Sequence, residues 1–447
     1  MTIDRRDFLK TATAGAAMSL GGVTPLATGL LSPRGTPVKR REGQAPDFVV
    51  IGAGTFGMWT ALNLVRLGAT VTVVDAYGPA NSRSTSGGET RGVRSSYGDR
   101  PHGLQWVYWA DEAIRRWTQW DEEGSELLLP RVFFQTGDLI MREEMEPYLE
   151  DTVAHWDTVG IEYETLGPDE IARRWPWINP EGITTALYEP GAGVVRARRA
   201  IESVATRFTH EGGEIRIARA SLGGQNGGRL DDIVLDGEES LSGSTFIFAL
   251  GPWFPKFFPE LMGKRLMIPI GYVFYFGIQD SRWMYPNMPS YGVPGCTGWP
   301  ALPPDHRGFR VRTGGKAGDD PDTSDRWADL ESHDSPRRII ERYFPDLIGA
   351  PIAETRACHY ELGPGGNFLV DKHPDFENVW LAGSGSAEAF KQGPVLGEYI
   401  AKRVMGLDDQ PQLAEGFALP EEEFEDDFFE RAARRDTTAR RDSVRSG

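Results

Sequence analysis

The sequence predicts an α/β fold with two parts: a discontinuous domain built on a parallel sheet, and a second domain with a mixed or antiparallel sheet. Three observations support this prediction. An apolar strand, a glycine turn, a helical pattern and a second strand follow one another over residues 48–75. Two more apolar strands, 245–250 and 379–382, also run into glycines but lie far along the chain. Strand patterns at 266–278 and 309–312 fall between them and indicate another sheet.

The glycine turn near the start of the first domain carries the strongest motif. Its G-x-G-x-x-G spacing follows the strand 48–51, and the second strand, 71–74, ends in an acid. The first glycine permits a tight turn, the second lets the backbone approach a pyrophosphate, and the third lets the helix pack on the strand. The acid can accept a hydrogen bond from a ribose hydroxyl. These residues are Gly52, Gly54, Gly57 and Asp75.

This order of elements predicts a Rossmann-like dinucleotide-binding unit. The helix N-terminus that follows the glycines offers free N–H groups and the positive end of a dipole to phosphate. A lone glycine motif is weak, and the alternative is a βαβ turn that binds no phosphate. The two strands, the helix and the acid together favour the dinucleotide.

The N-terminus is interpreted as a targeting signal. Arg5 and Arg6 are followed by Phe8, Leu9 and Lys10, and then by a weakly apolar run over 11–31 that glycines and a proline interrupt. This pattern resembles a twin-arginine (Tat) signal, which exports folded proteins to the bacterial periplasm. The alternative is a basic, unstructured N-terminus. Residues 32–45 read as a linker, so the signal and linker together span 1–45.

Composition restricts the partners. The net charge of −17 disfavours nucleic acid and anionic membrane surfaces, so we expect no nucleic-acid partner and membrane contact only during export. The two cysteines, Cys296 and Cys358, could pair in an oxidising compartment. The sequence has neither a C-x-x-C motif nor a histidine cluster, so we expect no metal site.

The remaining elements alternate between the two predicted domains. Helices are expected over 104–120, 143–159, 200–208 and from Pro394 to about Met405. The dinucleotide domain is thus interrupted, whereas a nicotinamide-binding domain is usually contiguous, and this discontinuity favours FAD. The expected boundaries are 46–130, 191–264 and 355–412 for the FAD-binding domain, 131–190 and 265–354 for the substrate domain, and 413–447 for a charged tail.

Motifs at both ends of the chain carry a family resemblance. The first is Gly88-Glu89-Thr90-Arg91, followed by Arg94. The second is Cys358-His359-Tyr360, followed further on by Gly383 and by Phe390-Lys391. From about Asp47 to Gly406 the chain resembles monomeric sarcosine oxidase, N-methyltryptophan oxidase and related FAD-dependent amine oxidoreductases of the D-amino acid oxidase superfamily.

The resemblance implies a cofactor and the residues that hold it. In the family, a cysteine at the position of Cys358 carries FAD through an 8α-thioether bond, so we expect covalent FAD and no Cys296–Cys358 disulfide. The alternative is an inert thiol beside noncovalent FAD. The expected cofactor-binding residues are Gly52, Gly54, Gly57, Asp75, Thr90, Arg91, Cys358 and Gly383.

The resemblance also implies a substrate site. Arg91 matches an arginine beside the flavin ring, where a fixed positive charge stabilises reduced flavin. Arg94 and Lys391 match the pair that binds the substrate carboxylate, and Tyr360 matches a tyrosine of the substrate pocket. Arg91, Lys391 and Arg310 are the expected catalytic residues.

The chain departs from the family at several of these positions. Gly87 stands where relatives carry a histidine. The family lysine above the flavin aligns with Arg310, or less directly with Lys316, and arginine cannot release a proton as lysine can. Ala387 and Glu388 replace a glycine-rich spacing before Lys391. Sarcosine itself is therefore not the expected substrate, and fast reaction with oxygen is not assured.

We therefore expect oxidation of the C–N bond of a secondary amine or an N-substituted amino acid, with oxygen or another acceptor taking the electrons. Three alternatives stay open at this point: a D-amino acid or primary-amine oxidase or dehydrogenase of the same superfamily, a flavin-binding protein without turnover, and a nicotinamide-dependent dehydrogenase.

Overall fold

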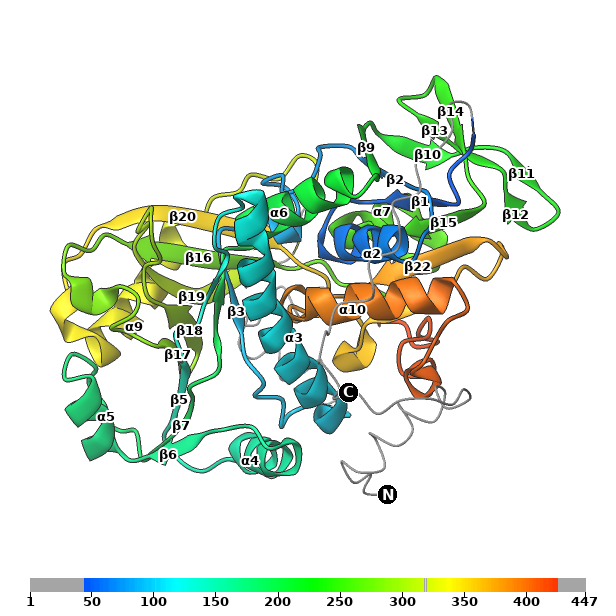
Figure 1. The fold of residues 1–447 in the computed structure, drawn as a ribbon. Coiled ribbons are helices and arrows are strands. Elements are labelled where there is room, and N and C mark those ends of the chain that lie inside the picture. The colour runs from blue at the N-terminus through cyan, green and yellow to red at the C-terminus, as the bar shows by residue number, and fades with distance from the viewer. Residues whose placement is uncertain (1–43, 101, 317, 319, 425–447) are drawn as a thin grey trace.

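A computed structural model describes residues 44–424 except 101, 317 and 319. It consists of two large sheets with helices packed against each of them (Figure 1). The twin-arginine prediction falls on residues outside this range and stays a prediction.

The first sheet has six strands in the order β21-β22-β15-β1-β2-β9. Its strands are parallel except for β21, which pairs with β22 in the antiparallel sense. β1 is buried on both faces, as expected for a central strand of a covered parallel sheet. The strands are β1 (Phe48–Ile51), β2 (Val71–Asp75), β9 (Glu214–Ile217), β15 (Thr245–Phe248), β21 (Leu369–Lys372) and β22 (Val379–Gly383).

The second sheet has eight strands in the order β20-β16-β19-β18-β17-β5-β7-β6. All neighbours are antiparallel except β17 and β5. The mixed sheet predicted for the second domain is therefore present. Its strands are β5 (Asp138–Arg142), β6 (Glu164–Leu166), β7 (Thr185–Glu189), β16 (Ile270–Phe276), β17 (Ser290–Val293), β18 (Cys296–Trp299), β19 (Phe309–Lys316) and β20 (Ile352–His359).

Three smaller sheets complete the strands. One of them, in the order β3-β8-β4, carries the arginine motif. Its strands are β3 (Arg91–Val93), β8 (Gly193–Val195) and β4 (Phe133–Phe134). The others contain β10 (Ala220–Leu222), β13 (Asp232–Leu235) and β14 (Glu239–Ser242), and β11 (Gln225–Asn226) with β12 (Arg229–Leu230).

The helices pack mainly on the first sheet. The longer ones are α2 (Thr55–Arg66), α3 (Gly103–Gly124), α4 (Pro147–Val159), α6 (Ala197–His210), α9 (Asp334–Tyr343) and α10 (Ala389–Val404). The shorter ones are α5 (Pro168–Arg174), α7 (Phe254–Phe257) and α8 (Pro259–Met262). The predicted helices at 104–120, 143–159 and 200–208 correspond to α3, α4 and α6.

The predicted start of the last helix is wrong. A proline is favoured at the first helical position, which suggested a start at Pro394. The helix instead begins at Ala389, and Pro394 lies inside it. Tight packing on α2 explains this: a Cβ added at Gly393 or Gly397 would lie within 2.7 Å of Trp59 atoms, so the two helices are in close contact. This packing outweighs the cost of an interior proline.

The two sheets draw on alternating segments of the chain. All strands of the six-stranded sheet lie within 46–130, 191–264 and 355–412, the segments expected for the FAD-binding domain. The strands of the eight-stranded sheet lie within 131–190 and 265–354, except that β20 continues past 354 to His359. β20 pairs with β16 along this extension, so Cys358 lies in the second sheet, opposite Gly271.

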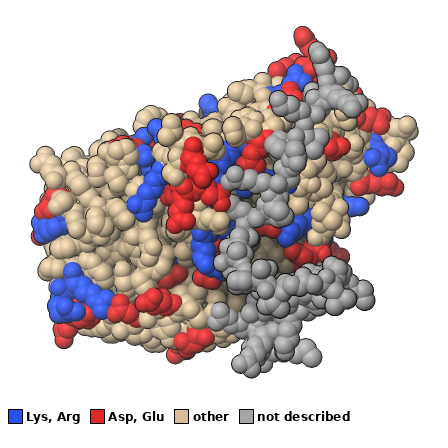
Figure 2. Space-filling view, viewed as in Figure 1, with Lys and Arg blue, Asp and Glu red and all other residues tan. Residues whose placement is uncertain are grey.

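The surface seen in Figure 2 carries acidic and basic side chains intermixed rather than gathered by sign. Arg115, for example, pairs with Asp111 and Glu112 on the exposed side of α3. Among the described residues, no helix is both long enough and apolar enough to span a bilayer.

Candidate active site

The glycine turn has the close approaches that its sequence predicts. Gly52 has a φ of +110°, and a Cβ there would lie 2.2 Å from the carbonyl oxygen of Ala249 on the neighbouring strand connection. A Cβ at Gly57 would lie 1.8 Å from the carbonyl oxygen of Gly52. Gly54 precedes α2 and provides no side-chain cap, and the first N–H of the helix, that of Thr55, donates to the hydroxyl of Ser86 at 2.9 Å. The first and third glycines are thus required by backbone contacts of the fold.

Substitution of Gly57 by alanine is expected to destabilise the protein by about 3 kcal/mol, because the new methyl group meets backbone that cannot rotate away. Thermal unfolding and the flavin content of the purified variant measure this effect. Gly191→Ala is the control, since a Cβ there meets nothing within 4 Å. Equal stability of the two variants would contradict the close packing of α2 on β1.

Asp75 closes the turn at the end of β2. Its carboxylate accepts hydrogen bonds from the backbone N–H groups of Ala53 and Tyr77, both at 2.8 Å. Burial raises the pKa of this carboxyl above its ordinary value, and the backbone donors oppose that shift. Asp75 therefore connects the glycine turn to β2. Its side chain also lines a cavity between the two large sheets.

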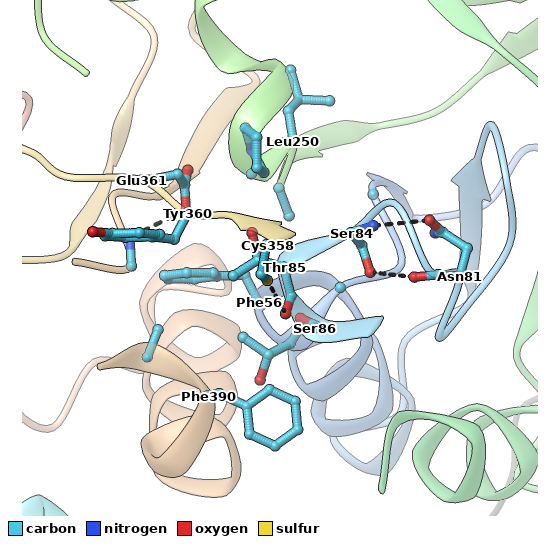
Figure 3. A pocket seen from close by; sticks show the side chains of 18 of the residues that line it. Phe56, Asn81, Ser84, Thr85, Ser86, Leu250, Cys358, Tyr360, Glu361 and Phe390 are labelled. Atoms are coloured by element: carbon cyan, nitrogen blue, oxygen red, sulfur yellow. Dashed lines mark hydrogen bonds between the residues drawn. The ribbon is translucent and has the colours of Figure 1, made fainter. Parts of the chain in front are cut away.

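One cavity brings most of the predicted site residues together. It runs from the glycine turn to α10 and lies between the two sheets, and Figure 3 shows Asn81 and Ser84 at one end and Tyr360 and Glu361 at the other. The predicted residues that line it are Gly52, Gly54, Asp75, Arg91, Arg94, Arg310, Cys358, Tyr360 and Lys391.

Three predicted cofactor-binding residues do not line this cavity. Gly57 packs against the strand behind the turn. Thr90 is buried and accepts a hydrogen bond from the indole N–H of Trp299 at 2.9 Å. A Cβ at Gly383 would lie 2.5 Å from the ring of Phe254 and 3.0 Å from a carboxylate oxygen of Glu361. These residues support the wall of the cavity from outside.

Cys358 and Arg91 meet in the middle of the cavity. The Sγ of Cys358 lies 3.4 Å from Nη2 of Arg91, and the guanidinium also donates to the carbonyl oxygens of Thr85 and Thr90. Both cysteines are free, so the expectation of no disulfide agrees with the structure. Cys358 is half-buried and reachable from the cavity, whereas Cys296 is buried in β18.

Arg94 follows β3 and is held by an acid from the second sheet. Its Nε lies 3.8 Å from the carboxylate of Asp138 on β5. Burial alone would lower the pKa of Arg94, but Asp138, with smaller contributions from Tyr148 and Glu388, raises it above its ordinary value. Arg94 is therefore a permanent cation at the cavity wall.

Lys391 enters the same cavity from α10 and forms a buried ion pair with Glu388. Glu388 also contacts Arg100 at 3.1 Å, and all three side chains are less than a tenth exposed. The charge of Lys391 acts on Asp138 as well, where burial raises the pKa of the carboxyl while Arg94 and Lys391 oppose that shift. Arg94 and Lys391, 297 positions apart in the sequence, thus flank one acid and one cavity.

Arg310 lies on β19 with its guanidinium 3.6 Å above the ring of Trp299. Its pKa is lowered to about 10, chiefly by burial, with smaller contributions from the charges of Arg91 and Arg312 and an opposing effect of Tyr275. Its Nε and Nη1 atoms are buried without a hydrogen-bond partner among the described residues. Arg310, rather than Lys316, is therefore the cation at this wall, since Lys316 lies outside the cavity lining.

Sequence reasoning missed three residues of the site. Arg312 lines the cavity beside Tyr360, and the alternation of Arg310 and Arg312 along one strand could have placed both on one face. Glu361 also lines the cavity, directly after Tyr360. Asp138 holds Arg94 but carries no sequence signal, because its role depends on the pairing of distant segments.

The arrangement fits FAD. The turn at Gly54 and the start of α2, with the hydroxyl of Ser86 beside it, can receive a pyrophosphate, and Asp75 can receive a ribose. A half-buried thiol lies beside a cation further along the same cavity. Donors of these kinds, in this order, suit an extended dinucleotide with a ring system at its far end.

Comparison with known proteins agrees with this assignment. Monomeric sarcosine oxidase from Arthrobacter sp. (strain TE1826) is 25% identical over 367 residues, covering 80% of this chain and 91% of the relative. N-methyl-L-tryptophan oxidase from Salmonella dublin is 24% identical over 366 residues, covering 80% and 95%. The crystal structure of fructosyl amine:oxygen oxidoreductase (Amadoriase I) from Aspergillus fumigatus superposes with a TM-score of 0.71 at 19% identity, covering 86% and 91%.

The family profile extends over most of the chain. The profile described as "DAO: FAD dependent oxidoreductase" matches residues 47–403, which include the glycine turn, both sheets and Lys391. This span begins with β1 and ends within α10. The chain therefore belongs to the DAO family of FAD-dependent oxidoreductases.

Proposed function

We propose that this protein oxidises the C–N bond of a secondary amine or N-substituted amino acid that carries a carboxylate. The observation that carries the proposal is the position of Arg94 and Lys391, which line one cavity with Cys358 and Tyr360 although they come from distant parts of the chain. When bound, FAD would supply the two-electron acceptor for this chemistry.

Arg94 and Lys391 would hold the substrate carboxylate. Arg94 offers a planar fork that suits two carboxylate oxygens, and Lys391 adds a compact charge from the other side. Asp138 pairs with Arg94, and Glu388 pairs with Lys391. These ion pairs hold the two cations in place. A carboxylate fixed at this point orients the amine end of the molecule towards the centre of the cavity.

Arg91 and Cys358 would hold the ring system of FAD. The thiol of Cys358 would form the thioether, and the adjacent guanidinium would stabilise negative charge on the reduced ring. Tyr360 and Arg312 line the same cavity, with the Arg312 guanidinium 5.7 Å from the centre of the Tyr360 ring, and would exclude water from the substrate. Arg310 contributes a further positive charge at this wall.

Anaerobic mixing of the purified protein with candidate amines tests the proposal. N-methyl amino acids are expected to bleach the flavin absorbance, and an aldehyde or keto acid should accumulate. The neutral amides of the same compounds should react far more slowly, because they lack the carboxylate. Peroxide formed on admission of air identifies oxygen as the acceptor, and slow reoxidation identifies a different one.

Three outcomes would contradict the proposal in different ways. Bleaching by primary but not N-methyl amino acids assigns the protein to primary-amine oxidation. A flavin that stays oxidised with every amine indicates a binding protein. Equal rates with carboxylates and their amides would remove Arg94 and Lys391 from substrate recognition.

A further inference from the structure

The proposed reaction, on which this inference rests, requires that the nitrogen of an ammonium substrate lose a proton. Amines of the proposed class are ammonium ions at neutral pH, and the carbon next to nitrogen gives up electrons only when the nitrogen lone pair is free. A substrate that enters the cavity as the ammonium ion must therefore lose a proton there before it is oxidised. The described residues that line this cavity include three carboxyl groups: Asp75, Glu361 and Glu388.

Two of these carboxyl groups are already occupied. Asp75 lies beside the glycine turn, where two backbone N–H groups hold it. Glu388 pairs with both Lys391 and Arg100. Asp75 therefore holds the glycine turn and Glu388 holds two basic side chains. Glu361 is the remaining candidate for the proton acceptor.

Glu361 is a buried acid without a cationic partner among the described residues. Its side chain is 5% exposed, and its two oxygens accept long hydrogen bonds from the backbone N–H groups of Ser384 at 3.3 Å and Gly385 at 3.2 Å. The lack of a side chain at Gly383 leaves room for it, because a Cβ there would lie 3.0 Å from Oε1. The fold therefore keeps a weakly held carboxyl group at the cavity wall, next to Tyr360 (Figure 3).

We propose that Glu361 accepts the proton of the bound substrate ammonium. The N–H bond of the ammonium breaks, an O–H bond forms on the carboxylate, and a neutral amine and a neutral carboxyl group result. No electrons are transferred in this step. The neutral amine is then competent for oxidation.

The titration of Glu361 suits this role. Burial raises its pKa to about 7, against the opposing effect of the backbone donors at Gly385 and Ser384. A base with a pKa near the working pH is deprotonated in a large share of the molecules and still binds a proton strongly enough to take it from the substrate. Basic side chains on the neighbouring helices pair with other acids: Arg66 on α2 with Glu211, Lys256 on α7 with Asp320 and Asp322, and Lys391 on α10 with Glu388. Arg312 lines the cavity beside Tyr360.

Glu361→Gln removes the base and keeps most of the shape of the side chain, since the amide oxygen can still accept from one of the two backbone N–H groups that the carboxylate oxygens accept from. In anaerobic stopped-flow measurements, bleaching by an N-methyl amino acid should rise through about pH 7 in the native protein and then level off. The variant should be slower by about 100-fold at pH 7. Its rate should keep rising tenfold per pH unit, because only free amine reacts.

Proton release on ligand binding gives a second readout that does not depend on turnover. 2-Aminoisobutyrate is an ammonium ligand with no hydrogen on its α-carbon. Calorimetry in buffers of different ionisation enthalpy should show release of about half a proton at pH 7, because half of the free Glu361 is protonated while the bound amine and Glu361 together hold one proton. The Gln variant should release none.

Glu189→Gln is the matched control. Glu189 is also fully buried with its pKa raised to about 7 by burial, but it bonds to Ser95 and does not line the cavity. Its substitution should leave the pH profile in place. A Glu361→Gln variant that is slowed equally at every pH, or that releases protons as the native protein does, would overturn the proposal. Flavin that no amine bleaches at any pH would instead contradict the proposed function.

Discussion

Substitution of Cys358 by alanine is expected to convert an acid-stable flavoprotein into one that loses its flavin on acid precipitation. In the native protein the precipitate should retain the flavin, and a peptide containing Cys358 should be heavier by one FAD. The reason is geometric: this thiol lines the cavity and lies 3.4 Å from the guanidinium of Arg91. Fluorescence of pellet and supernatant, with mass spectrometry of the digest, measures the change.

Cys296→Ala serves as the control for this experiment. Cys296 is buried in β18, outside the cavity lining, and burial raises its pKa to about 12, so it stays a neutral thiol. Its substitution should leave the flavin in the precipitate. Flavin in the supernatant of the native protein would show noncovalent binding. Flavin in the precipitate of Cys358→Ala would place the bond on another residue.

The parts of the fold that depend on local chemistry could be predicted from the sequence. The strand before Gly52, the helix after it and the acid at Asp75 are adjacent in the chain, and each has a residue pattern of its own. The alternation of segments between two sheets was also predictable, because buried strands ending in glycine recur far apart. The family resemblance then placed Arg94, Lys391 and Cys358 in one site, and the structure brings all three to one cavity.

The parts that depend on packing could not be predicted. Pro394 suggested a helix start, but contact between Gly393 and Trp59 extends the helix towards its N-terminus. Thr90 belongs to a motif at the site, yet it does not line the cavity, and its hydroxyl accepts a hydrogen bond from Trp299, which does. The properties of Glu361 arise from burial between segments that the sequence keeps apart, so no local pattern indicates a pKa near 7.

Asp138 pairs with Arg94 and Glu388 pairs with Lys391, and these ion pairs bear on the result expected when the charge of Lys391 is removed. Lys391→Met keeps much of the apolar stem but removes the charge. The apparent KM for an N-methyl amino acid should rise by about tenfold or more, since a hydrogen bond to a charged group contributes about 1.5–3 kcal/mol. Glu388 stays paired with Arg100 at 3.1 Å, so the loss falls on the substrate rather than on the fold. Steady-state kinetics with the carboxylate and its neutral amide measures it.

Lys402→Met is the matched control on the same helix. Lys402 pairs with Glu398 one helical turn away, much as Lys391 pairs with Glu388, but it lies outside the cavity lining. Its substitution should leave the KM unchanged. The neutral amide should lose little affinity in Lys391→Met, because the amide has no negative charge for Lys391 to bind. An equal rise for carboxylate and amide would indicate a collapsed pocket, and an unchanged KM for the carboxylate would mean that Arg94 alone recognises it.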